Sequence, residues 1–108
     1  MDKTISQLQK DAHLTAKEKG WWDEPRTFLE CIALIHSELS EAVECYRKNG
    51  LQIPGETLTK DDLSVELADT LIRIFDMCQY YGIDLERALE YKMEFNKSRP
   101  YRHGGKKA

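Results

Sequence analysis

Two pairs of carboxylates have a spacing that places both members of each pair on one face of a helix. Glu38 and Glu41 are three residues apart, and so are Glu66 and Asp69. Residues three apart on a helix are neighbours, so each pair can converge on one cation. Oxygen ligands without nearby His or Cys favour Mg²⁺, or Mn²⁺ as a substitute, over Zn²⁺. If the helices that carry the two pairs pack side by side, the sequence predicts a four-carboxylate metal site.

The same carboxylates also fit a simpler interpretation. Acidic pairs are frequent on solvated helix faces, where like charges at this spacing cost about 0.2–0.5 kcal/mol per pair. Arg73 follows Asp69 by four residues and could form an ordinary ion pair with it. A helical interaction module whose acidic groove is solvated, or holds a structural cation, is therefore an alternative to a catalytic site. The occurrence of two pairs on consecutive predicted helices favours the metal site.

Four helices are predicted to carry these residues, from apolar periodicity and from the residues that start and stop helices. Gly50 is a typical C-terminal stop, residues 59–62 (Thr-Lys-Asp-Asp) form a capping-box pattern, and Asp84 is a typical N-cap. The loop before this capping-box pattern spans residues 51–56. The expected helices begin near Ile5, Arg26, Asp62 and Asp84 and end near Gly20, Asn49, Gly82 and Ser98.

The two long predicted helices differ in how much of their surface is apolar. The second helix has one apolar stripe, with Glu38 at its edge. The third is apolar over most of its circumference, apart from a narrow polar strip of Asp62, Glu66, Asp69, Arg73 and Asp76. A short chain buries such a helix only at the centre of a bundle. We therefore expect an all-α, four-helix bundle-type subunit, oligomeric with a shared helical core, whose acidic strip faces an interior cleft.

Length and charge limit the domain organisation and the partners. The 108 residues fit one domain, expected to span 1–98, followed by a basic tail at 99–108. Residues 97–108 contain five basic and no acidic residues, and removing them from the net charge of −3 leaves −8 on the rest. An acidic body repels nucleic acid, so no nucleic-acid partner is expected.

The pattern of apolar residues and the cysteines bear on the cellular compartment in which the protein is expected. Charged residues interrupt every apolar stretch, and the first ten residues lack the apolar segment of a signal peptide. A cytoplasmic protein without a membrane partner is therefore expected. The three cysteines, Cys31, Cys45 and Cys78, form no C-x-x-C motif. They are interpreted as small core residues rather than as disulfides or zinc ligands.

The acidic motifs resemble a known signature. Ser37-Glu38-Leu39-Ser40-Glu41, followed by Glu66-Leu67-Ala68-Asp69, is similar to the metal-binding motif of the MazG-like, all-α nucleoside triphosphate pyrophosphohydrolases. The resemblance covers nearly the whole chain and includes the runs at 21–26, 68–73 and 92–104. It implies that water attacks the α-phosphorus of a nucleoside or deoxynucleoside triphosphate, giving the monophosphate and pyrophosphate.

The resemblance also implies roles for individual residues. Glu38, Glu41, Glu66 and Asp69 match the catalytic magnesium ligands of the family. The ions would neutralise phosphate oxygens, stabilise the leaving pyrophosphate and lower the pKa of the attacking water. Many members carry a further Glu, suited to act as general base, where this chain has Ser37. A serine hydroxyl is not a base at neutral pH, so the base is either one of the four acids or a hydroxide on the metal.

Further residues are candidates for substrate binding. Lys92 and Asn96 match family positions that contact phosphate or metal, and Arg99 follows with charge of the right sign, as does Arg102. The alternative is a solvated helix end whose basic residues favour the helix dipole. Trp22, or else Trp21, could stack on a nucleobase. The alternative for the tryptophans is that they pack the first helix against the second.

Two further functions stay open. The first lies in the same superfamily and is hydrolysis of another pyrophosphate-containing metabolite, such as phosphoribosyl-ATP. The second is the non-enzymatic interaction module introduced above. Base and sugar preference depend on loop geometry and on residues of a second subunit, because a homodimer or homotetramer is expected.

Overall fold

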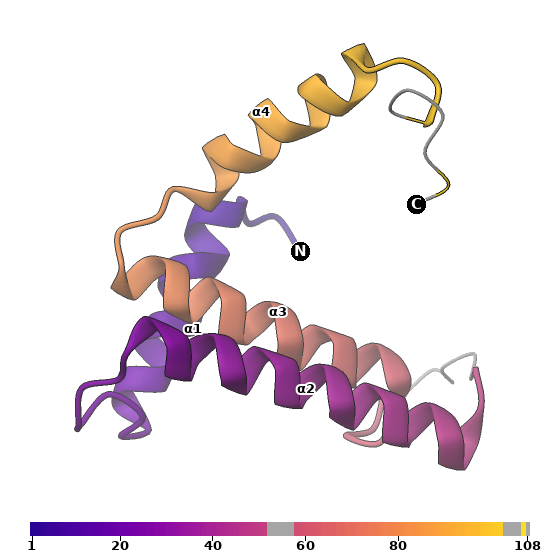
Figure 1. Cartoon of the computed structure of the whole chain (residues 1–108). Coiled ribbons are helices and arrows are strands. Elements are labelled where there is room, and N and C mark those ends of the chain that lie inside the picture. The colour runs from indigo at the N-terminus through magenta and orange to yellow at the C-terminus, as the bar shows by residue number, and fades with distance from the viewer. Residues whose placement is uncertain (52–57, 103–106, 108) are drawn as a thin grey trace.

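The computed structural model describes residues 1–51, 58–102 and 107. These residues form four α-helices and no strand, namely α1 (Ile5–Glu18), α2 (Phe28–Asn49), α3 (Leu63–Tyr80) and α4 (Leu85–Ser98) (Figure 1). The all-α prediction is therefore confirmed. Most of the loop predicted at 51–56 and most of the basic tail beyond residue 102 lie outside the described residues, as does the 103–104 end of the family resemblance.

Local side-chain bonds fix where the helices begin. The Thr27 hydroxyl accepts the Glu30 N–H at 3.1 Å, so α2 begins two residues after the expected Arg26. The Asp84 carboxylate accepts the Arg87 N–H at 3.1 Å, which confirms the predicted cap of α4.

The predicted capping box before α3 is wrong in detail. Asp62 is the N-cap residue, and its side chain makes no cap bond within the helix. The Asp62 carboxylate instead accepts the Thr59 N–H at 2.9 Å, which closes the turn that precedes the helix. A complete capping box does form at α1, between Thr4 and Gln7.

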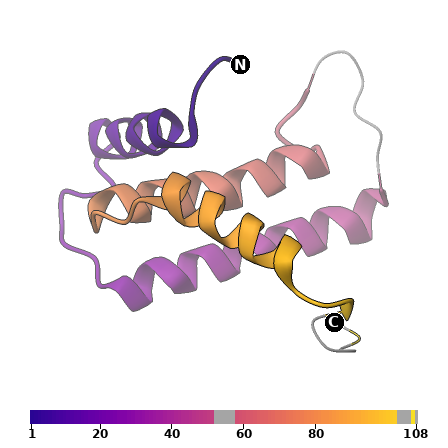
Figure 2. The same cartoon turned by 90° about the horizontal axis from the view of Figure 1, so that it is seen from above.

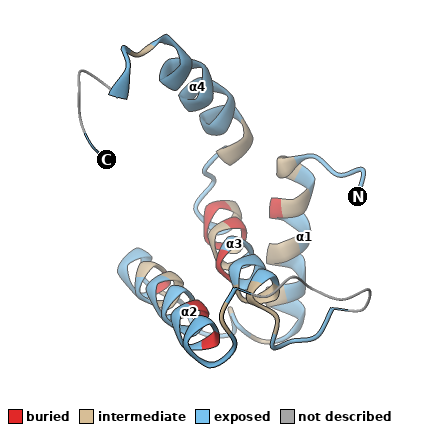
Figure 3. Ribbon diagram, turned by 90° about the vertical axis from the view of Figure 1, so that its right-hand side faces the viewer, coloured by how far each residue is buried: buried red, intermediate tan, exposed pale blue. Residues whose placement is uncertain are grey.

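α3 lies at the centre of the packed part of the chain. It contacts α1 on one side and α2 on the other, as Figure 3 shows in a view along the helix. The core between them contains Cys31, Met77 and Cys78, with Trp22 and Ile35 packed against it. The three cysteines are buried free thiols, which confirms their prediction as core residues. Burial raises the pKa of the Cys31 and Cys78 thiols, since a thiolate would be poorly solvated there.

α4 departs from the expected four-helix bundle. It packs weakly, mainly against the start of α1, and contains no buried residue. It projects away from α2 and α3 in Figure 1, and seen from above it crosses over them (Figure 2). Within one chain the compact unit therefore has three helices. The expectation that α3 is buried nearly all round also holds only in part, because Leu67, Leu71 and Ile72 are each about half exposed.

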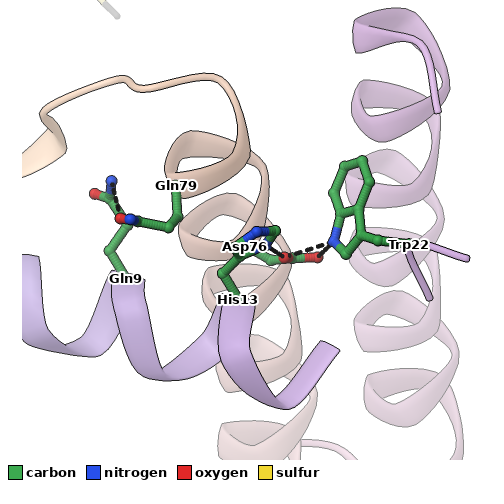
Figure 4. Close-up of polar contacts among 5 residues, drawn as sticks. All are labelled: Gln9, His13, Trp22, Asp76 and Gln79. Atoms are coloured by element: carbon green, nitrogen blue, oxygen red, sulfur yellow. Dashed lines mark hydrogen bonds and ion pairs between the residues drawn. The ribbon is translucent and has the colours of Figure 1, made fainter. Parts of the chain in front are cut away.

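Three hydrogen bonds fix the direction in which α4 leaves the unit. The buried Gln9 amide on α1 donates to Gln79 Oε1 at 3.2 Å (Figure 4) and to the Ile83 carbonyl at 2.8 Å. The Ser6 N–H, at the start of α1, donates to Glu86 Oε1 at 3.2 Å. Both ends of the α3–α4 connection are therefore attached to α1. Among the described residues, the helices lack the combination of length and apolar character needed to cross a membrane.

Candidate metal centre

The structure brings three of the four expected ligands together. Glu38 on α2 faces Glu66 and Asp69 on α3, and one oxygen of each carboxylate lies within 4.8 Å of the others. The arrangement follows from the packing of α2 against α3, because Glu66 and Asp69 lie on the part of α3 that meets Glu38 at the edge of the apolar stripe of α2. Three carboxylates from two helices therefore share one small volume.

Glu41 lies at the margin of this group. Its side chain is exposed, and it is not one of the three residues whose oxygens converge. It is nevertheless close enough to affect Glu66 electrostatically. Burial is the largest cause that raises the pKa of Glu66, and the negative charges of Asp69, Glu41 and Glu38 raise it further. The four expected ligands thus form a tight trio with a fourth carboxylate nearby.

The donor set fits a hard divalent cation. All converging atoms are carboxylate oxygens, and burial, with the neighbouring carboxylates as the second cause, raises the pKa of Glu66. Oxygens on opposite sides of a Mg²⁺ ion lie roughly 4.2 Å apart, twice the usual Mg–O distance. Small side-chain rotations would bring the three oxygens, now within 4.8 Å, to such distances.

Arg73 pairs with Glu38 rather than with Asp69. The Arg73 Nε donates to Glu38 Oε1 at 2.7 Å, and both side chains are largely buried. The i,i+4 pair with Asp69, which the simpler interpretation of the sequence allowed, is not among the ion pairs of the described residues. Among the described residues, Arg73 makes the single ion pair that involves any of the four carboxylates.

Trp22 is held in a network that the sequence did not reveal. Its indole Nε1 donates to both oxygens of Asp76, at 2.9 and 3.2 Å, and the same carboxylate lies 2.7 Å from His13 Nδ1 (Figure 4). The indole ring also stacks on Tyr80, with ring centroids 3.9 Å apart and planes at 8°. These contacts support the packing interpretation of Trp22, while its expected contact with a base stays a prediction.

Trp21 is the more accessible of the two tryptophans. The residue is half exposed and its ring lies near two guanidinium groups, with Arg26 Cζ at 5.2 Å and Arg73 Cζ at 5.6 Å from the ring centroid. These distances allow cation–π attraction. Trp21 therefore stands next to the residue that pairs with Glu38.

A groove of about 830 Å³ adjoins the carboxylates. Glu38, Asp69, Arg73, Trp21 and Arg26 contribute to its wall, and apolar residues of α1 and α3 form most of the remainder. Sites for small ligands have volumes of about 300–1,000 Å³, so the groove is large enough for a nucleotide.

The expected substrate-binding residues on α4 lie apart from this site. Lys92, Asn96 and Arg99 belong to α4 or its C-cap, and α4 extends away from α2 and α3 (Figure 1). The Lys92 Nζ and the Arg99 Cζ lie over the Phe95 ring, 4.7 and 5.5 Å from its centroid. One chain therefore groups these residues with one another but not with the carboxylates.

Ser37 has a backbone partner. Its hydroxyl donates to the Leu34 carbonyl at 3.2 Å, one turn earlier on α2. This is the common arrangement of a serine on an exposed helix face, and it gives Ser37 no basic function.

Comparisons with known proteins add no assignment to this geometry. Searches of family models, of characterised proteins and of solved structures each find no match to the chain. The MazG-like resemblance therefore rests on the sequence motifs alone and stays a prediction.

Proposed function

We propose that the protein is a magnesium-dependent enzyme that hydrolyses a nucleoside or deoxynucleoside triphosphate to the monophosphate and pyrophosphate. The observation that supports this proposal best is the convergence of Glu38, Glu66 and Asp69 within 4.8 Å, from two helices and with the pKa of Glu66 raised. These three residues would hold the cation, and a rotation of Glu41 would add a fourth ligand. Bound Mg²⁺ supplies charge neutralisation for the phosphates and a more acidic water.

In this proposal the base and sugar of the substrate bind in the groove beside the carboxylates. Its apolar walls suit a base and sugar, while Arg26 and Arg73 add positive charge at the end near Glu38 and Asp69. Half-exposed Trp21 offers its ring at the same end. A nucleoside triphosphate held by the cation would therefore extend along the wall of this groove.

We further propose that the enzyme is a cytoplasmic homo-oligomer in which α4 packs on a second copy. The accessible surface is 8559 Å², whereas a compact monomer of this length exposes about 6,200 Å². The radius of gyration is 16.4 Å, against about 13 Å for a compact domain. The apolar side chains of α4, which include Leu89, Met93 and Phe95, are exposed in the single chain. An extra surface of roughly 2,300 Å² is of the size that each chain of an obligate dimer buries.

This assembly would also allow Lys92 and Asn96 to take the role in substrate binding that the sequence predicts for them. Both lie on the helix that projects from its own chain, so docking α4 on a second copy could bring their polar groups to that copy's carboxylates. Size-exclusion chromatography with light scattering measures the mass directly. A monomer at about 50 µM would refute the oligomer but would leave the metal site standing, since its three ligands come from one chain.

The test of the reaction is pyrophosphate release from a panel of ribo- and deoxyribonucleoside triphosphates, with phosphoribosyl-ATP included, in Mg²⁺ and in EDTA. Glu38→Gln and Asp69→Asn are expected to lower turnover at least about a hundredfold, because each removes a charged ligand. Glu44→Gln is the matched control, since Glu44 is an exposed acid of α2 that pairs with Arg47. Unchanged turnover in Glu38→Gln or Asp69→Asn would refute the metal site.

The alternative is the interaction module with a solvated or cation-binding acidic groove. The Arg73–Glu38 ion pair favours it to some extent, because this pair already neutralises part of the acidic group without a metal. If the wild-type protein cleaved no member of the panel, while Mg²⁺ still raised its melting temperature, the module would be the better assignment.

A further inference from the structure

Arg73 holds an unusual position for a basic residue, because it reaches from α3 to one of the three converging carboxylates on α2. Its Nε bonds to Glu38 Oε1 at 2.7 Å, with exposed side-chain fractions of 28% for Arg73 and 16% for Glu38. Of the ion pairs among described residues, it alone joins α2 to α3. The pair therefore lies at the packed interface of the proposed metal site.

This position makes Arg73 a competitor of any cation that uses Glu38. The guanidinium occupies one Glu38 oxygen and places a positive charge beside the group that Glu38 forms with Glu66 and Asp69. Two neighbouring positive charges repel strongly when they are partly buried. Arg73 therefore opposes cation binding for as long as it stays on Glu38.

The structure also provides a place to which the guanidinium can move. Arg73 contributes to the wall of the 830 Å³ groove, and its Cζ lies 5.6 Å from the ring centroid of the half-exposed Trp21. A phosphate chain beside the carboxylates would lie within reach of this side chain. Guanidinium groups bind phosphate oxygens through charge-assisted hydrogen bonds, so the phosphate would replace Glu38 as the partner.

We propose that Arg73 couples metal binding to triphosphate binding by exchanging Glu38 for a phosphate oxygen of the substrate. Without triphosphate, Arg73 holds Glu38 and keeps the affinity for free divalent cations low. With triphosphate, Arg73 bonds to the phosphates and Glu38 is free to bind the cation. This inference rests on the proposed metal site, and it predicts that Arg73 affects the two ligands in opposite directions.

Calorimetric titration tests the inference without any measurement of turnover. Mn²⁺ is titrated into the wild-type protein and Arg73→Gln, alone and with a triphosphate analogue that has a non-hydrolysable α,β-methylene bridge. Arg73→Gln is expected to bind Mn²⁺ alone at least about tenfold more tightly, because a repelling charge is removed. It is expected to bind the analogue, at saturating Mn²⁺, at least about tenfold more weakly, because a charge-assisted bond is lost.

Two further variants control for charge and for folding. Arg47→Gln removes an exposed guanidinium of α2 that pairs with Glu44 and not with the converging carboxylates, so its Mn²⁺ affinity should change by less than about threefold. Arg73→Lys keeps the charge, and its Mn²⁺ affinity should stay near that of the wild-type protein. Far-UV circular dichroism verifies that each variant is folded.

The exchange also has an optical signature at Trp21. In a Trp22→Phe background Trp21 is the remaining tryptophan, and its emission should change when Mg²⁺ and the analogue are added together but not with Mg²⁺ alone. The same addition should have little effect in Trp22→Phe/Arg73→Gln.

The outcomes separate this inference from the proposed function. If Arg73→Gln binds Mn²⁺ as weakly as the wild-type protein, or more weakly, the exchange is refuted while the metal site stands. Weaker binding of both ligands would assign Arg73 a purely structural role. If the wild-type protein binds no Mn²⁺ even with the analogue present, the metal site itself is refuted, and the exchange with it.

Discussion

Replacement of Asp76 by alanine is expected to destabilise the protein by roughly 2–4 kcal/mol, because each buried donor left without an acceptor costs about 1–3 kcal/mol. Asp76 accepts from Trp22 Nε1 at 2.9 Å and contacts His13 Nδ1 at 2.7 Å, and its side chain is 14% exposed. The substitution removes the carboxylate to which both Trp22 and His13 bond. It also detaches the turn that carries Trp22 from α3, so α1, α3 and the start of α2 should loosen together.

Urea unfolding in EDTA, at one fixed protein concentration, measures this loss through tryptophan fluorescence and far-UV circular dichroism. Asp76→Asn keeps one acceptor oxygen and should lose less. Asp11→Ala is the matched control, since Asp11 pairs with Lys3 on the exposed side of α1 and should change stability by less than about 1 kcal/mol. A loss below about 1 kcal/mol for Asp76→Ala, with an unchanged denaturant slope, would refute the reasoning.

Two other substitutions test local features. Glu66→Gln should stabilise the metal-free protein at pH 7 by roughly 0.5 kcal/mol, because it removes a carboxylate from a crowd of like charges. Burial and neighbouring carboxylates raise the pKa of Glu66 in the folded protein. Protonation of Glu66 therefore stabilises the folded protein. This contribution is fully present below the ordinary carboxyl pKa and is lost as the pH rises through the raised value. The advantage of Glu66→Gln should accordingly shrink when urea midpoints are measured near pH 4.5, and a constant advantage would contradict this assignment. Gly50→Ala should cost about 1–3 kcal/mol in the same urea assay, because Gly50 has φ 69° and ψ −166°, a conformation open essentially to glycine alone, although an added Cβ would meet no atom within 4 Å. Unchanged stability of Gly50→Ala would show that the end of α2 adopts another backbone conformation.

The helices were predictable from sequence because their ends are determined by local chemistry. Gly50 ends α2 and Asp84 caps α4, as expected, and each acts on residues within one turn of itself. The shifted start of α2 has a local cause as well. Thr27 is a better N-cap than the Pro25-Arg26 segment before it, and its hydroxyl binds the Glu30 N–H.

Which of the four carboxylates converge was only partly predictable from sequence, because this depends on how α2 is rotated about its axis against α3. Residues three apart on a helix are offset by about 60° around its axis. On α3 both Glu66 and Asp69 remain on the side that meets α2, whereas on α2 the same offset carries Glu41 to the exposed margin. The spacing of each pair is visible in the sequence, but the helix rotation is not.

The hydrogen-bond and ion-pair partners that lie on other helices could not be predicted from sequence for a related reason. Arg73 has Asp69 one turn away, yet it bonds to Glu38, whose largely buried carboxylate gains more from a neutralising partner than the exposed Asp69 does. His13 and Trp22 both bond to Asp76, at a distance in sequence that no local pattern covers. One signal was available, because Asp76 is the last residue of the polar strip on α3 and needed a partner in so apolar a helix.

The attachment of the α3–α4 connection to α1 has a consequence for evolution of the protein's quaternary structure. Because Gln9 bonds to Ile83 and the Ser6 N–H bonds to Glu86, the angle of α4 depends in part on two residues of α1, which belong neither to α4 nor to the acidic group. A substitution at Gln9 would redirect α4 while its apolar surface stayed intact. Related chains could therefore acquire different subunit arrangements through single changes in α1, with their acidic residues conserved.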